Sequence, residues 1–180
     1  MRLAPALAAL FALCAPGFAE EEWVWPVPEI SRDISALPAP AQATRQALIE
    51  AARSGDIEAL RPIIEAQDYP PNVSFGDPED AVAYLRSESE DGEGRQILGL
   101  LLDLLDQPYA FHPDSSGETY YIWPYLAELD PNALTPEQEV DAYRLLDRAG
   151  LEDVRQFGGW YYWRLFISET GEWSAFVAGD

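Results

Sequence analysis

The chain has 180 residues, a length that suits one domain and is short for two. It carries 32 acidic residues against 11 basic ones, all of them arginine, for a net charge of −21 at pH 7. A charge of this sign repels nucleic acid and anionic lipid, so neither is an expected partner, and it favours a cation or a basic partner. A plainly solvated surface explains the same charge. The absence of lysine excludes Schiff-base chemistry.

Residues 1–19 have the layout of a secretory signal peptide. Arg2 provides the positive start, residues 3–13 are apolar but too short to span a bilayer, and Ala19 is the small residue before the expected cleavage. We therefore predict a periplasmic or secreted protein with no membrane insertion after cleavage. Cys14, the only cysteine, would leave with this segment, so the mature chain would have no disulfide and no thiolate.

Residues 20–40 hold four prolines and show no apolar period, which predicts an extended arm. We expect this arm to lie across a single α+β domain formed by residues 41–180. Four large apolar residues of the arm are expected to dock it on the domain: Trp23, Trp25, Val27 and Ile30.

Helices dominate the first half of the domain. Residues 41–53 are rich in Ala, Leu and Gln, and residues 56–67 carry a helical apolar stripe that Pro62 should bend. Asp77, followed by a proline, marks the start of a third helix. Residues 95–106 are apolar around most of their circumference, which predicts a central buried helix.

The second half alternates strands with helices. Residues 109–112 and 119–123 are predicted to form two strands. Thr135 and Gln138 form a capping box for a helix that runs to about residue 148, and a short helix follows. The chain closes with the aromatic-rich residues 160–180, which we predict to form a β-hairpin that turns near its glycine at position 171.

This order of helices, hairpin, helices and hairpin predicts an α+β fold. In that fold the N-terminal helices pack on one face of a roughly four-stranded antiparallel sheet. The alternative is a cone-shaped fold like that of nuclear transport factor 2, which shares the order of elements. A likeness of this kind would not indicate a function.

The closing strand predicts a binding surface. Side chains of residues 160–167 alternate between two faces, and Arg164 interrupts the apolar run on one of them, so we predict that this face is open. Aromatic rings beside an arginine suit a sugar ring, a peptide or a carboxylate. In the alternative, Arg164 is structural and pairs with an acid. The predicted ligand-binding residues are Trp160, Tyr162, Arg164, Trp123 and Tyr125.

No residue is predicted to be catalytic, and neither a metal nor a cofactor is predicted. His112 is the only histidine, and the chain has no Gly-x-Ser-x-Gly motif, so a serine-histidine site has little support. A zinc site would have one histidine and no cysteine in the mature chain. The acidic loop at residues 88–93 lacks the twelfth-position glutamate of an EF-hand.

Three motifs resemble a group of secreted bacterial proteins to which no activity is assigned. They are Trp123-Pro124-Tyr125, Leu134-Thr135-Pro136 followed by Gln138-Glu139-Val140, and Gly171-Glu172-Trp173 leading to Phe176-Val177-Ala178-Gly179-Asp180. The resemblance covers residues 40–180 and implies an exported single domain. It assigns no functional residues.

Three functions therefore stay open. The first is an exported, non-enzymatic domain that binds a small molecule, a glycan or a protein through the aromatic face. The second is a cell-envelope hydrolase that uses a carboxylate pair, which 32 acidic residues always offer. The third is an assembly role through the arm at residues 20–40.

Overall fold

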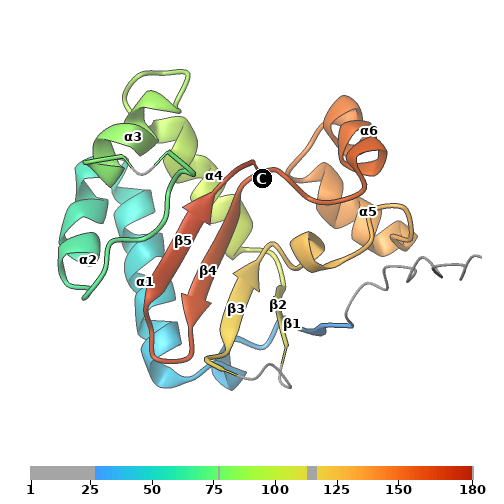
Figure 1. Ribbon diagram of the computed structural model, residues 1–180, viewed down its shortest axis with the longest axis horizontal. Helices are drawn as coiled ribbons and strands as arrows, with labels where there is room; N and C mark the ends of the chain where they lie inside the picture. Colours follow the sequence, from blue (N-terminus) through green and yellow to red (C-terminus); the bar gives the residue numbers. More distant parts are fainter. Residues whose placement is uncertain (1–26, 77, 113–116, 180) are drawn as a thin grey trace, which may run out of the picture.

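The computed structural model describes residues 27–76, 78–112 and 117–179. In these ranges the chain forms six α-helices and an open antiparallel sheet of five strands in the order β1-β2-β3-β4-β5 (Figure 1). The predicted α+β class is confirmed, and the predicted number of strands was one too few. Residues 1–19, predicted to be a signal peptide, and Trp23 and Trp25 lie outside the described residues. Within those ranges no helix has the length and apolar character needed to cross a membrane.

The helices and strands have the following bounds. The strands are β1 (Glu29–Ser31), β2 (Tyr109–Phe111), β3 (Tyr120–Trp123), β4 (Arg164–Ser168) and β5 (Trp173–Val177). The helices are α1 (Ala39–Ser54), α2 (Arg61–Glu65), α3 (Ala81–Ser87), α4 (Arg95–Leu105), α5 (Pro136–Tyr143) and α6 (Arg148–Phe157). Three short 3-10 helices are η1 (Ile34–Ala36), η2 (Ile57–Leu60) and η3 (Tyr125–Glu128).

Local capping explains where several helices start and stop. Helix α1 ends at Gly55, which has φ 72°, and α5 begins at the predicted capping box of Thr135 and Gln138. The predicted start of the third helix was wrong, because Asp80, rather than Asp77, caps α3. The Asp80 carboxylate accepts hydrogen bonds from the backbone N–H groups of the second and third helical residues. This later start places the aspartate directly before the apolar residues that α3 buries.

The predicted helix from residue 135 to about 148 is interrupted. Helix α5 ends at Tyr143, and α6 starts at Arg148. Asp147 causes the new start, because its side chain accepts a hydrogen bond from the backbone N–H of Gly150 at 2.8 Å. Helix α6 therefore turns away from α5, and the two form a small unit of their own.

The main core lies between the sheet and the N-terminal helices, as predicted. Helices α1 and α4 pack together, and α1 contacts β4. The strand side chains on this face are completely buried: Trp123, Leu165, Ile167, Trp173 and Phe176. Their positions in β3, β4 and β5 follow the pairing register, in which Trp123 lies opposite Leu165 and Leu165 lies opposite Phe176.

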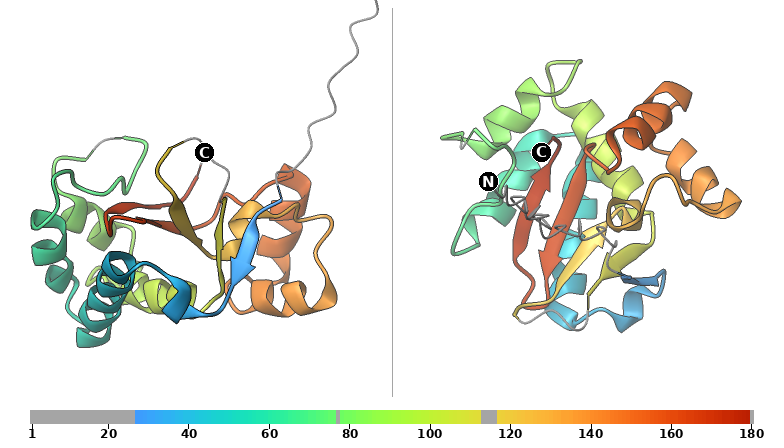
Figure 2. Two further views of the ribbon diagram at one scale, coloured as in Figure 1. Left: turned by 90° about the horizontal axis from the view of Figure 1, so that it is seen from below. Right: turned by 45° about the vertical axis from the view of Figure 1, so that its right-hand side comes forward.

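A second core lies on the other face of β2. Tyr109 belongs to the main core, whereas the next residue, Ala110, packs with residues of η3, α5 and α6. Successive side chains of a strand point to opposite faces, so the two cores are separated by the strand itself. Figure 2 shows α5 and α6 as a pair beyond β2 and β3, away from α1, α2 and α3.

The fifth strand comes from the predicted arm. β1 pairs antiparallel with β2, and Arg32 donates a hydrogen bond from Nη2 to Oδ2 of Asp141 at 2.6 Å. The expected docking through apolar side chains was wrong where it can be checked. Val27 is 91% exposed and Ile30 is 42% exposed. The described part of the arm is held by backbone pairing with β2, by the Arg32–Asp141 ion pair, and by Leu37, which is buried in the main core.

Candidate functional site

Three of the five predicted binding residues are core residues. Trp123 is 0% exposed, and Tyr125 and Trp160 are each 4% exposed, so they do not form an open face. The predicted exposure of Trp160 was wrong because β4 begins only at Arg164, so the alternation of strand side chains does not extend back to residue 160. Trp160 packs instead in the second core, where Leu151 of α6 also lies.

Arg164 acts as a cross-link between two backbone segments. Its Nη1 donates a hydrogen bond to the carbonyl of Trp160 at 2.7 Å, and its Nη2 donates to the carbonyl of Gly179 at 2.6 Å. The backbone N–H of Gly179 donates to the carbonyl of Tyr161 at 2.7 Å. Arg164 therefore holds residues 160–163, here called the aromatic segment, against the end of β5.

We expect Arg164→Ala to lower the free energy of unfolding by about 2–3 kcal/mol, because two charge-assisted hydrogen bonds are lost in a half-buried place. Arg164→Lys is the control, since it keeps the charge but cannot reach both carbonyls with one planar fork. Chemical denaturation followed by circular dichroism measures both. Equal stability of Arg164→Ala and the parent would contradict the cross-link.

A pocket of about 530 Å³ lies between α4, the start of α6 and the aromatic segment. We call it the α4–α6 pocket. Its apolar wall includes Leu100, Leu104, Leu146, Trp160 and Trp163. Its polar lining includes four exposed carboxylates: Glu88, Glu90, Asp103 and Asp147. No arginine or histidine is among the described residues that line it.

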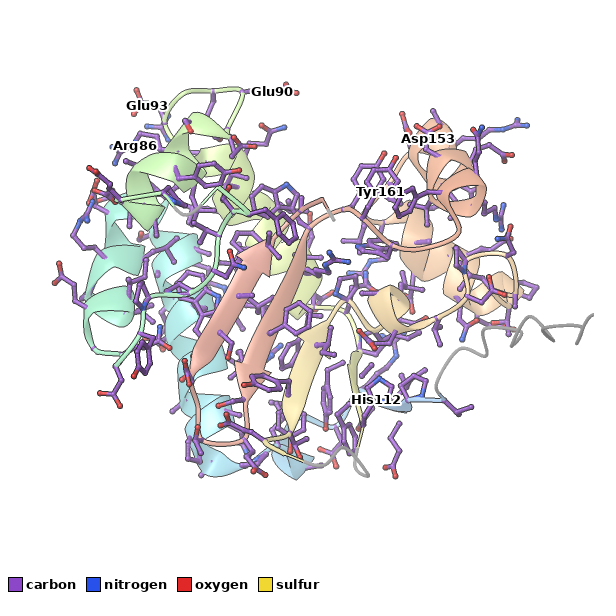
Figure 3. All side chains as sticks on the ribbon, in the orientation of Figure 1. Arg86, Glu90, Glu93, His112, Asp153 and Tyr161 are labelled. Carbon is purple, nitrogen blue, oxygen red and sulfur yellow. The ribbon has the colours of Figure 1, made fainter. Side chains whose placement is uncertain are left out.

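Ring contacts order the aromatic segment. Tyr161 and Tyr162 stack with ring centroids 4.7 Å apart and planes at 25°, and Trp160 meets Tyr162 at 6.3 Å in an edge-on arrangement. In Figure 3 the labelled Tyr161 lies beside α6, and Glu90 lies across from it on the loop before α4. The pocket is therefore bounded by segments from the two units that carry the separate cores.

Among the described residues that line the pocket, Tyr162 is the only one with a side-chain hydroxyl group. Hydrogen bonding with Tyr161 and burial raise the pKa of Tyr162 to about 12, and the charges of Asp153 and Asp147 act in the same direction. Its hydroxyl is close to Gly150, where an added Cβ would be 3.1 Å from the oxygen. The hydroxyl is neutral at physiological pH, so it can both donate and accept a hydrogen bond.

The two other candidates considered from the sequence, His112 and the acidic loop at residues 88–93, have structural partners. His112 Nε2 lies 2.8 Å from Oε2 of Glu128. Asp91, in the acidic loop, accepts from the backbone N–H groups of Glu93 and Gly94. In the ranges that the structure describes, no group of three or more His, Cys, Asp or Glu side chains is placed to hold a metal ion. These contacts explain the acidic loop as a turn and a helix start.

The carboxylates do not reveal a general acid. Five described carboxyl groups have a clearly altered pKa, and it is lowered in each: Asp33, Glu58, Asp80, Asp91 and Glu118. Hydrogen bonds to their oxygens are the leading cause. A glycosidase acid needs the opposite shift. The hydrolase hypothesis stays a prediction with no carboxylate pair singled out.

Comparisons of the chain with protein-family models, with curated proteins and with solved structures found no match. The site is therefore argued from its own geometry. Sequence reasoning named two residues of the pocket lining, Trp160 and Tyr162, and missed the third ring, Trp163. It also missed Asp103 on α4 and Asp147 at the N-cap of α6, because an exposed acid gives no local signal that it shares a pocket with others.

Proposed function

We propose that this chain is an exported, non-enzymatic binding domain that takes a small molecule in the α4–α6 pocket. The observation that carries the proposal is the combination in one concave space of three aromatic side chains, an aliphatic wall and a few polar groups. Small-molecule sites have this composition, and their volumes run from roughly 300 to 1,000 Å³. The proposal retains the binding role predicted for Trp160 and Tyr162, but it assigns them to this pocket and not to a face of the sheet.

Export and the choice of partner belong to the same proposal. Export rests on the pattern of residues 1–19. A small molecule is favoured over nucleic acid because the net charge of −21 repels a polyanion.

Gly99 provides a direct test of the pocket. It lies on α4 and in the pocket lining, and a Cβ built there meets no atom within 4 Å. Gly99→Phe should therefore fill the pocket without disturbing the core. We expect that a fragment library screened by NMR gives hits on the parent protein and that Gly99→Phe abolishes their binding.

Gly99→Ala is the matched control. It adds one methyl group to the same exposed helical position, so it should keep the binding and raise the free energy of unfolding by up to about 1 kcal/mol. Hits that bind Gly99→Phe as well as the parent would place binding elsewhere. A library without hits on the folded parent would contradict the proposed function.

A further inference from the structure

We infer that the ligand of the α4–α6 pocket is an organic cation, a small molecule with an ammonium group on an apolar body. This inference rests on the proposed function, because it names the class of ligand for the same pocket. Three features of the lining lead to it: the sign of the charge, the aromatic rings, and the absence of a site built for a bare metal ion.

The charge of the lining has a single sign. Glu88, Glu90, Asp103 and Asp147 contribute carboxylates, and no described lining residue contributes a positive charge. The backbone N–H of Glu90 is held by Oε1 of Gln96 at 2.7 Å, which orders the loop next to α4. An anionic ligand would be repelled here, whereas each carboxylate would attract a cationic ligand.

The rings provide the second feature. Trp160 and Trp163 are the two tryptophans of the lining, and Tyr162 is the tyrosine between them in sequence. The face of an aromatic ring attracts a cation, and tryptophan does so most strongly. A neutral phenol oxygen such as that of Tyr162 can also accept a hydrogen bond from an ammonium N–H.

The third feature separates an organic cation from a metal ion. A hard metal ion needs several oxygen ligands converging at short distance, and the described residues include no group of three acids placed in that way. The lining instead has an aliphatic wall that includes Leu100, Leu104 and Leu146. Such a wall gives contact to carbon atoms, so the cation that fits has an apolar body.

Pairs of isosteric probes test the inference. Choline is compared with the neutral 3,3-dimethylbutan-1-ol, and butylammonium with butan-1-ol, by calorimetry or NMR titration of the full chain. The cation of each pair should bind at least about tenfold more tightly than its neutral partner, through cation–π and carboxylate attraction. Added salt should weaken the binding of the cation and leave the binding of the neutral compound unchanged.

Charge variants provide the internal control. The double variant Glu90→Gln with Asp103→Asn removes two carboxylates of the lining. It should lower the affinity for the cationic probes about tenfold or more and leave the affinity for the neutral probes unchanged. Glu93→Gln is the matched control, because Glu93 lies on the same acidic loop and does not line the pocket.

The outcomes separate the two proposals. If each neutral partner binds as tightly as its cation, or if no cation binds while other fragments occupy the pocket, the organic-cation inference is wrong and the binding function stands. If neither these probes nor any library fragment binds the folded parent, the binding function itself is wrong. An equal loss in Glu93→Gln and in the double variant would assign the effect to overall charge and would also overturn the inference.

Discussion

Trp160→Ala is expected to lower the free energy of unfolding by about 3–5 kcal/mol, the usual cost of removing a large buried aromatic side chain. Trp160 is almost fully buried between the second core and the α4–α6 pocket. Its indole Nε1 donates to the carbonyl of Trp163 at 3.3 Å, and its own carbonyl accepts from Arg164. The substitution leaves a cavity in a small core and removes a wall of the pocket.

Trp160→Phe separates packing from hydrogen bonding. It keeps a ring in the wall and loses the hydrogen bond from the indole, so it should cost about 1–2 kcal/mol. Denaturant unfolding followed by far-ultraviolet circular dichroism measures both variants. A loss below about 1 kcal/mol for Trp160→Ala would mean that α5 and α6 do not depend on this residue.

Gly171→Ala is expected to cost at least about 3 kcal/mol, since two penalties add at one position. Gly171 has φ 90°, a region that residues with a Cβ rarely adopt. An added Cβ would be 2.8 Å from Cβ of Pro40 and 2.9 Å from its carbonyl carbon and oxygen. The turn between β4 and β5 lies against the start of α1, where Thr44 Oγ1 donates to the Gly171 carbonyl at 2.6 Å.

Gly55→Ala is the control for this experiment. Gly55 also has a positive φ, 72°, but an added Cβ there meets nothing within 4 Å. It should cost only the conformational strain, about 1–2 kcal/mol. The difference between the two variants in the same unfolding assay reports the contact with Pro40. Equal losses would show that the hairpin turn moves away from α1 at no cost.

Some helix ends were predictable because their signals are local. The stop at Gly55 and the capping box at Thr135 each lie within a few residues of the helix end that they determine. β1 was not predictable as a strand, because Glu29–Ser31 has only one apolar residue and is defined by its pairing with β2 about 80 residues later. Long-range pairing of this kind leaves little trace in a three-residue segment.

The pocket was predictable only in part. The density of aromatic residues drew attention to Trp160 and Tyr162, which line the α4–α6 pocket, but the assumed strand alternation placed them on a sheet face. The α4–α6 pocket brings the acidic loop and α4 together with residues 145–163, which follow about 40 residues or more later in the chain. That arrangement depends on how the two cores pack, and neither core is visible in the residues of one segment.

The most direct test of the account is a titration of the parent protein, labelled with nitrogen-15, with the screening hits and the cationic probes. The indole N–H signals report on individual tryptophans. We predict that the signals of Trp160 and Trp163, which line the pocket, shift together on binding. Those of Trp123 and Trp173, which are buried in the main core, should stay in place. Binding that moves Trp123 or Trp173 and leaves Trp160 and Trp163 unchanged would contradict the α4–α6 pocket as the functional site.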